Sequence, residues 1–566
     1  MAADTINIPQ PPREEEQLGY YYGLPSRPKL VARSSTDPYK YNFDFSTQYP
    51  VGKLLSSVRQ HPIADLWNTD GPLRREIVLA LDGIQWTVID VLRLGYQPRM
   101  TEELQLNHPV TLLISVKKDS TPWEQGHSVV VRCHEILQNY GISDVHCEMK
   151  ESHTIRLASP PAAPLSAPKL HSEYAQTYPG RSTTCEVECE KIHAVLSAYL
   201  GHSIATFDQP TREGTKCLYL RRKDTGQVLL LICRHALFNG TSANEDYIYD
   251  ESNAESMVTI LQPGDDTLAR RKKDIALCIK CVDFHIESIK RLDELTQDEK
   301  KARIAEELAT LPRLEAAAGR LEDVSPPATR IIGHVLFSPK FGTSTRTTGQ
   351  SSSQRVRDWA LIELHPGKHA SPLEELENEV SVTEKERLNL LCAHEVEGFT
   401  FHRHLSFHYL RNTLPLVGMV SEAETKGGEH ESRLPEEPAI LVGKRGQRSK
   451  LTYGLANNVT SLMREVVDNI EFVSEEWCIL GPKPCGWMTD RRHCFCGLGD
   501  SGSCIWDLQS RVGGMLTSAS GDPTYGGIDT AYATPMEWLL EDMRAYGYDV
   551  EILDGERPDS DIGQAD

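Results

Sequence analysis

The sequence predicts a mainly β protein that carries one long helical insertion. The apolar run Val228–Phe238 is typical of a buried strand, and Val110–Val116 is a second run of this kind. Residues 265–323 follow a different period, in which branched apolar residues recur at steps of four and three. These residues are Ile275, Ile279, Val282, Ile286 and Ile289. We therefore expect β-sheets to form the core and a helical element to interrupt them.

The insertion contains a second helix start. Thr296 and Glu299 have the spacing of a capping box, and Pro312 is expected to kink the helix that follows. Together the segments predict an antiparallel helical hairpin over residues 265–323. Packing of this hairpin on the β domain is favoured over an oligomerisation arm. A place beside the active-site face would also let it gate access or bind a protein partner.

A small α/β domain is predicted over residues 46–157. Val110–Val116 is its first strand, residues 121–140 form a helix capped by Thr121, and residues 144–149 alternate as a second strand. No glycine pattern for phosphate binding accompanies these elements. We assign the domain no chemistry and regard it as a candidate surface for a protein partner.

Composition distinguishes the segments that flank the predicted α/β domain and the segment that ends the chain. Residues 1–45 are polar and Pro-rich and are predicted to be disordered. Residues 158–180 are rich in Pro, Ala and Ser, as linkers are, and residues 547–566 form an acidic tail. The main domain is therefore expected over residues 181–546.

Charge and cysteine usage exclude several classes of function. The 566 residues carry a formal net charge of −21, which argues against nucleic acid and anionic membranes as partners. The polar start of the chain does not resemble a secretory signal, so a cytoplasmic location and free thiols are expected. Cysteines before residue 497 lack the two tidy pairs of a zinc site, so neither metal nor cofactor is expected. The residues in question are Cys478, Cys485, His493, Cys494 and Cys496.

The segment Gly499-Asp500-Ser501-Gly502 has the pattern of a loop that presents a nucleophilic serine. A serine hydroxyl is a weak nucleophile and has to face a base, and glycines on both sides allow the tight turn this requires. The backbone N–H groups of Gly499 and Ser501 would then converge on one point as an oxyanion hole.

A base and its orienting carboxylate are found upstream. His235 ends the apolar run that begins at Val228, and Asp358 directly precedes the apolar segment Trp359–Leu364. A carboxylate at the edge of a buried strand needs a partner, which a neutral His235 would supply. His334 is the nearest alternative base, but it lies close to Asp358 in the chain and is expected on an intervening strand.

These segments resemble the chymotrypsin- and trypsin-like serine peptidases, in which the triad follows the order His, Asp, Ser. The resemblance covers about residues 196–546 and is closest to trypsin-like proteins of filamentous fungi. It implies a double β-barrel with His235, Asp358 and Ser501 as the catalytic triad. It also implies that Thr517, Ser518 and Ala519 pair with the backbone of a protein or peptide substrate.

The chain departs from digestive trypsins in ways that affect specificity and activation. Phe495 occupies the position that sets specificity for basic residues, and an apolar group there cannot neutralise a buried Lys or Arg. No Ile-Val-Gly-Gly start follows a basic cleavage site near residue 200, so pairing of Asp500 with a freed N-terminus is not expected. Two functions fit the sequence: a serine endopeptidase, or a catalytically idle peptidase fold that acts as a binding or regulatory module.

Overall fold

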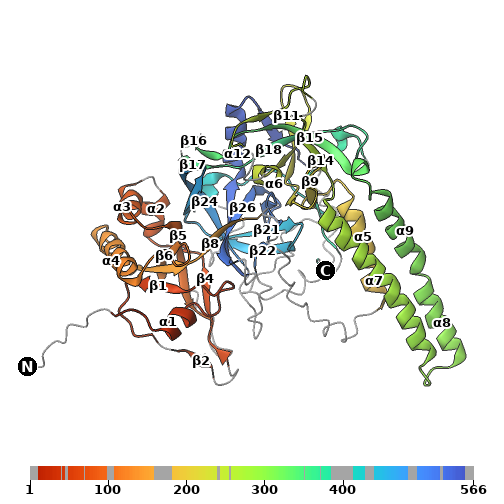
Figure 1. Ribbon diagram of the computed structural model, residues 1–566, viewed down its shortest axis with the longest axis horizontal. Helices are drawn as coiled ribbons and strands as arrows, with labels where there is room; N and C mark the ends of the chain where they lie inside the picture. The colour runs from red at the N-terminus through yellow and green to blue at the C-terminus, as the bar shows by residue number, and fades with distance from the viewer. Residues whose placement is uncertain are drawn as a thin grey trace, which may run out of the picture.

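The computed structural model describes residues 10–554 with interruptions, and all statements below concern these described residues. The interruptions are residues 40, 45–48, 69–70, 98–107, 158–180, 239–242, 254–255, 350, 370, 384–385, 387–411, 428–438, 482–493 and 523–526. The fold is mainly β, as expected, with two large sheets at the centre and helices at the two ends (Figure 1). The predicted linker at 158–180 lies outside the described residues.

The larger sheet has 13 strands and joins the N-terminal and C-terminal parts of the chain. Its path runs through β1 (Leu30–Arg33), β7 (His146–Glu151), β6 (Val110–Val116), β5 (Trp86–Tyr96), β23 (Ser461–Val467), β24 (Ile470–Leu480), β22 (Lys450–Ala456), β21 (Ile440–Gly446), β25 (Cys504–Asp507), β26 (Val512–Asp522) and β27 (Gly527–Pro535). In addition, β4 (Lys53–Ser56) pairs with β5 and β8 (His153–Arg156) pairs with β26. Because β24 also pairs with β27, strands β21, β22, β24, β27, β26 and β25 form a closed ring.

The second sheet has nine strands and holds the largest apolar cluster of the molecule. Its order is β10 (Glu213–Thr215), β9 (Ser203–Thr206), β14 (Thr259–Leu261), β15 (Ile331–Ser338), β18 (Ala360–Leu364), β12 (Val228–Ile232), β11 (Leu218–Arg222) and β28 (Val550–Ile552), with β13 (Tyr247–Ile248) on β15. Strand β28 lies within residues 547–566, the segment predicted as an acidic tail. Val550 and Leu553 bury their side chains in this cluster and so hold that end of the chain in place.

Residues 10–157, which we call the N-terminal unit, are built into the larger sheet. Helices α2 (Ile63–Asn68), α3 (Pro72–Ala80) and α4 (Trp123–Asn139) enclose a core with the strands of this unit. Val459 and Leu462 belong to the same core, because β5 pairs with β23. The division at residue 157 is therefore a boundary in sequence and not in the sheet.

The expectation of disorder over residues 1–45 is wrong for the part that is described. Helix α1 (Glu14–Gly19) and strand β1 are formed, and β1 pairs with β7. Tyr21 and Leu30 are fully buried, although the segment around them is polar and rich in Pro. Their partners lie more than a hundred residues away, for example Glu148, which accepts a hydrogen bond from Tyr21 Oη at 2.8 Å.

The expected helical hairpin is present at the other end of the molecule. Helix α7 (Asp265–Lys290) packs against α8 (Gln297–Leu308) and α9 (Leu311–Asp323), and α5 (Arg181–Val195) joins them. The predicted capping box between Thr296 and Glu299 is formed. In place of the kink expected at Pro312, the chain breaks into two helices, and Pro312 occupies the first turn of α9.

Short elements complete the fold. Strands β16 (Gly342–Thr348) and β17 (Ser351–Arg357) form a hairpin, and α12 (Met536–Ala545) packs against β16 and β26. The other short elements are β2 (Phe43–Asp44) with β3 (Tyr49–Pro50), β19 (Glu379–Ser381) with β20 (Thr413–Pro415), α6 (Arg234–Leu237), α11 (Glu422–Thr425), and the 3₁₀ turns Pro327–Arg330 and Leu373–Glu375.

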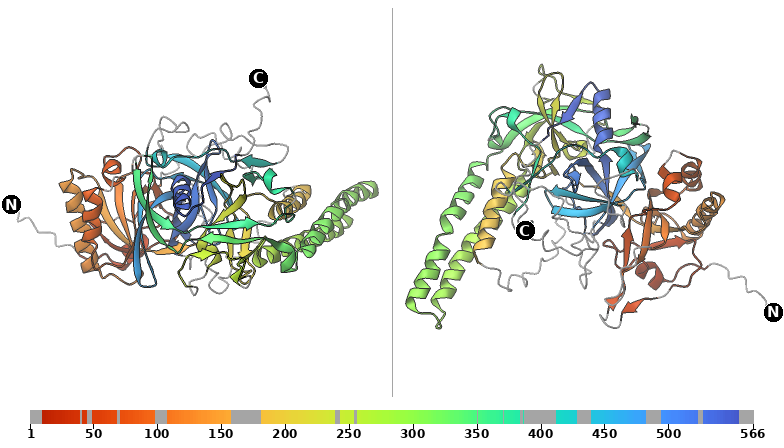
Figure 2. Two further views of the ribbon diagram at one scale, coloured as in Figure 1. Left: turned by 90° about the horizontal axis from the view of Figure 1, so that it is seen from above. Right: turned by 180° about the vertical axis from the view of Figure 1, so that it is seen from behind.

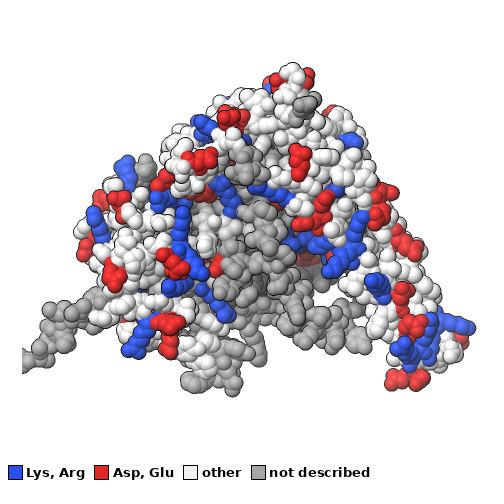
Figure 3. All heavy atoms as spheres, in the orientation of Figure 1, with Lys and Arg blue, Asp and Glu red and all other residues white. Residues whose placement is uncertain are grey.

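Acidic and basic side chains are interspersed over the face drawn in Figure 3. Among the described helices, none combines the length and the apolar character needed to cross a membrane.

Candidate functional site

Three separate elements deliver the predicted triad to one place. Strand β12 ends at Ile232, and the short helix α6 that follows carries His235. Asp358 lies between β17 and β18, and β18 pairs with β12. Ser501 lies in the loop before β25, in the ring of strands. The site therefore forms where the two large sheets meet.

The three side chains form a chain of hydrogen bonds. His235 Nε2 lies 2.7 Å from Ser501 Oγ, and the other ring nitrogen, Nδ1, contacts Asp358 Oδ2. The backbone N–H of His235 also donates to Asp358 Oδ1 at 2.9 Å. Because Nδ1–H donates to the carboxylate, Nε2 is free to accept the proton of the serine hydroxyl.

Neighbouring charges and hydrogen bonds keep the Asp358 carboxyl ionised although it is buried. Burial by itself would raise the pKa of Asp358, but the adjacent His235 ring outweighs it, and the Arg156 guanidinium adds to the effect. The resulting pKa lies below the ordinary value. A buried carboxylate in this position orients the imidazole and stabilises it when it becomes charged.

Glycines allow the tight turn of the serine loop. Gly499 has a φ of +102° and Gly502 a φ of +89°, both in the region that side chains disfavour. A Cβ on Gly502 would also lie 2.2 Å from the carbonyl oxygen of Thr215. These constraints explain why glycine occupies both positions beside Asp500 and Ser501.

A buried lysine that the sequence did not reveal holds the same loop. Lys444 Nζ on β21 lies 3.2 Å from Asp500 Oδ2, and both side chains are fully buried. Asp500 also accepts hydrogen bonds from the backbone N–H groups of Gly497 at 2.9 Å and Arg448 at 2.8 Å. Burial acts to raise the pKa of Asp500, but Lys444 and these hydrogen bonds hold it below its ordinary value.

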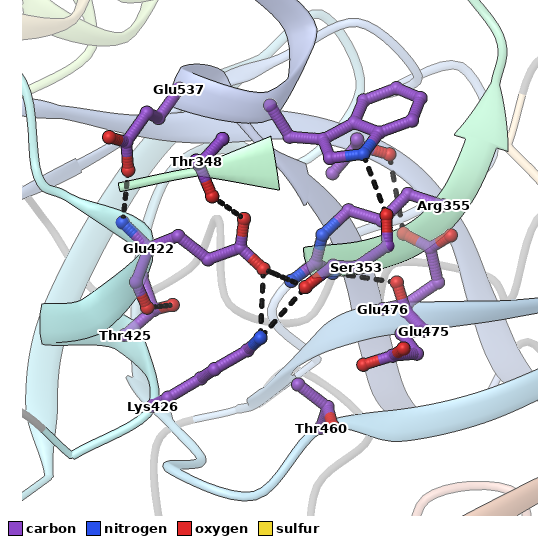
Figure 4. Close-up of polar contacts among 12 residues, drawn as sticks. Thr348, Ser353, Arg355, Glu422, Thr425, Lys426, Thr460, Glu475, Glu476 and Glu537 are labelled. Atoms are coloured by element: carbon purple, nitrogen blue, oxygen red, sulfur yellow. Dashed lines mark hydrogen bonds and ion pairs between the residues drawn. The ribbon is translucent and has the colours of Figure 1, made fainter. Parts of the chain in front are cut away.

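A second buried polar network anchors the strand that leads to Asp358 (Figure 4). Arg355 on β17 donates to Glu422 Oε1 at 2.5 Å and to the carbonyl oxygen of Glu475 at 2.6 Å. The Glu422 carboxylate also accepts from Thr348 Oγ1 at 2.7 Å, which ties β16 to the same centre. This network therefore fixes the paired strands β16 and β17 directly before Asp358.

The residues predicted to contact substrate line one wall beside Ser501. The carbonyl oxygen of Thr517 lies 3.5 Å from Ser501 Oγ. Ser518 and Ala519 continue along β26, where they pair with β27 on one side and with β8 on the other. Phe495 is buried in the apolar cluster of the ring of strands.

The alternative base lies elsewhere in the structure. His334 is on β15, as expected, where its Nδ1 lies 3.0 Å from His365 Nε2 and its ring contacts Tyr249. Of the two candidate histidines, only His235 contacts Ser501.

Metal-ligating residue types gather in the described residues at Cys233, His235 and Asp358. Burial raises the pKa of the Cys233 thiol well above its ordinary value, which opposes the thiolate form that a metal requires. From the cysteine group near the serine loop, Cys478 is buried on β24, whereas Cys485 and His493 lie outside the described residues.

Comparison with known proteins adds little to this geometry. A family model for the CAP N-terminal conserved motif matches residues 313–354, a segment without His235, Asp358 or Ser501. No curated protein matches the chain. Among solved structures, the crystal structure of Cellulomonas bogoriensis chymotrypsin matches at 12% identity and a TM-score of 0.19, over 40% of this chain and 81% of that chain. This TM-score is too low to establish a shared fold, so function has to be inferred from the site itself.

Proposed function

We propose that the protein is a serine endopeptidase in which His235, Asp358 and Ser501 form the catalytic triad. The observation that carries the proposal is the 2.7 Å contact between His235 Nε2 and Ser501 Oγ, combined with the contact of Nδ1 with Asp358. Nucleophile, base and orienting carboxylate then have the mutual geometry that acyl transfer needs. The closed ring of strands and the nine-stranded sheet correspond, on this proposal, to the two barrels of a chymotrypsin-like peptidase.

The reaction follows from these positions. Ser501 Oγ attacks the substrate carbonyl carbon while His235 Nε2 takes the hydroxyl proton, and Asp358 stabilises the imidazolium that forms. His235 then gives the proton to the leaving amine, which leaves an acyl ester on Ser501. A water molecule attacks this ester with the same base, and the acid product and the serine are released.

Two further features support this assignment. Gly499 lies two residues before Ser501, and its φ of +102° gives the tight turn that an oxyanion hole formed by the N–H groups of Gly499 and Ser501 would require. Phe495 lies in a buried apolar cluster, and apolar surroundings at this position favour an apolar side chain before the cleaved bond.

Labelling with a fluorophosphonate probe, which reacts with activated serines, tests the proposal. We expect Ser501→Ala to abolish labelling and to leave thermal unfolding unchanged. Ser510→Ala is a matched control, because Ser510 is also buried and lies in the turn before β26, outside the site. Labelling that survives in Ser501→Ala but disappears in Ser510→Ala would refute the assignment.

A further inference from the structure

Strand β8 of the N-terminal unit lies along the wall where a substrate backbone would bind. It lies beside β26 in Figure 1. The two strands pair antiparallel, with Arg156 opposite Ser518 and Ile155 opposite Ala519. Ser152 Oγ, just before the strand, lies 2.9 Å from Ser520 Oγ and extends the contact. A strand added to an open sheet edge beside the nucleophile is the usual binding mode of an extended peptide.

Leu157, the residue after β8, reaches the reaction centre. Its carbonyl oxygen accepts a hydrogen bond from the backbone N–H of Gly499, one of the two N–H groups assigned to the oxyanion hole. Its side chain is fully buried in the apolar cluster that contains Phe495 and Leu516. The carbonyl and the side chain of Leu157 therefore occupy the two places that a residue before a cleaved bond would fill.

Arg156 is held beside the triad by contacts of its own. Its guanidinium pairs with Glu465 on β23 and lies over the Phe341 ring, 3.8 Å from the ring centroid. It is also close enough to Asp358 to lower the pKa of that carboxyl. Side chains therefore alternate along the segment as in a bound strand, with Ile155 and Leu157 buried and Thr154 and Arg156 half-buried.

We propose that this segment is a substrate of the enzyme itself, cut after Leu157, and that residues 153–157 stay in the cleft as the bound product. The inference rests on the proposed function and names its substrate class: an extended peptide with an apolar residue, here leucine, before the cleaved bond. In sequence the cut separates Leu157 from Ala158.

The step balances with water as the only co-reactant. Ser501 Oγ bonds to the carbonyl carbon of Leu157 as His235 takes its proton, and the C–N bond to Ala158 breaks when that proton passes to the leaving amine. Water then adds to the ester, its proton returns through His235 to Ser501, and Leu157 keeps a free carboxylate. No electron acceptor or donor takes part.

The product is retained because strand pairing, and not the linker at residues 158–180, holds the N-terminal unit against the rest of the protein. β5 remains paired with β23 and β8 with β26 after the bond is cut. A retained product blocks the cleft against other peptides, so we expect the mature enzyme to act slowly until this strand is displaced.

N-terminal sequencing and denaturing gel electrophoresis of the purified full chain test the inference. We expect two fragments, the second beginning at Ala158, in the wild-type chain, and an intact chain in Ser501→Ala and Leu157→Asp. The apolar pocket rejects an aspartate at 157, whereas Leu157→Ala, a milder change, should cut more slowly. Leu79→Asp is the matched control, because Leu79 is exposed in the same unit and should leave the cut unchanged.

Fluorophosphonate labelling of the same variants separates the two proposals. Leu157→Asp should label faster than the wild-type chain, because its cleft is vacated. An intact wild-type chain together with labelling of Ser501 in Leu157→Asp would overturn self-cleavage and leave the peptidase proposal standing. Absence of both cutting and labelling would overturn the peptidase proposal itself. A cut at another bond, or a cut that persists in Ser501→Ala, would overturn the self-cleavage proposal.

Discussion

The N-terminal unit and the helical hairpin lie at opposite ends of the molecule (Figure 2). In sequence, the N-terminal unit precedes the β domain and the hairpin interrupts it. The N-terminal unit shares its sheet and its core with the rest of the chain through β5 and β23. The hairpin instead encloses a small cluster of its own with α5. Two additions that look alike in sequence are thus coupled to the site to very different degrees.

The difference shows that a domain boundary predicted from sequence does not establish that the segment is structurally independent of the site. Leu157, from the unit to which the sequence assigns no chemistry, accepts a hydrogen bond from the Gly499 N–H that we propose for the oxyanion hole. Within the described part of the chain, the hairpin's contacts toward the site lie at its base, where Thr267 Oγ1 lies 3.2 Å from Gln447 Oε1. Perturbing each end of the molecule tests this contrast.

Removal of residues 1–157 should have the largest effect. The chain from residue 158 loses β5, one of the two strands that pair with β23, and exposes apolar residues such as Leu462 and Met463, so we expect it to lack a cooperative thermal transition. Co-expression with residues 1–157 as a separate chain should restore that transition. Cooperative unfolding of residues 158–566 alone, measured by circular dichroism, would show that the N-terminal unit is dispensable.

Lys150→Met should lower the free energy of unfolding by about 3 kcal/mol, because it weakens the contact between the N-terminal unit and the rest of the chain. Lys150 Nζ lies 3.4 Å from Asp529 Oδ2, both side chains are almost fully buried, and the variant leaves the aspartate without its cation. Ser26 continues to donate to Asp529, through Oγ at 2.6 Å and its backbone N–H at 2.9 Å, which limits the loss. Denaturant unfolding should show that adding Asp529→Asn recovers part of it; additive losses would contradict the pairing.

Lys53 should make the stability of the N-terminal unit depend on pH. Burial lowers the pKa of Lys53 to about 8, so between pH 8 and 9.5 the unfolded chain binds more protons than the folded one. The free energy of unfolding should therefore rise over this interval by up to about 2 kcal/mol. Lys53→Met should remove the rise, whereas the half-exposed Lys272 of the hairpin, replaced by Met, should leave it in place.

The hairpin tip should matter least. Replacing residues 283–310 with a short Gly/Ser linker keeps Val282 and Leu314 in the small cluster and shortens only the projecting part. We expect the free energy of unfolding to change by less than about 1 kcal/mol and probe labelling to keep its rate. Loss of folding would show that the hairpin is part of the core, and faster labelling would indicate that it gates the cleft.

Local patterns in the sequence were sufficient for some features and not for others. The apolar run before His235, the capping box at Thr296 and the heptad spacing of α7 depend on neighbours a few residues apart, and these elements were found. The pair between Lys444 and Asp500 joins a strand residue to a loop residue 56 positions later in the chain, so the local pattern does not predict it.

Residues 10–45 show the same limit in a different form. Their polar, Pro-rich composition predicts disorder. They are ordered because they pair with distant parts of the chain: Tyr21 bonds to Glu148, and β1 pairs with β7. The predicted triad was assembled from three local matches and their order. The pairing of β8 with β26 and the contact of Leu157 with Gly499 could not be predicted, because these residues are distant in sequence and meet only in the folded chain.

A pair of mass measurements on the wild-type chain tests the central claim, that the site cuts its own N-terminal connection and retains the product. Denaturing mass spectrometry should give two fragments that meet between residues 157 and 158, and native mass spectrometry should give one complex heavier than the intact chain by one water. Ser501→Ala should give the intact chain in both. A single unbroken wild-type chain under denaturing conditions, or separated fragments under native conditions, would contradict the account.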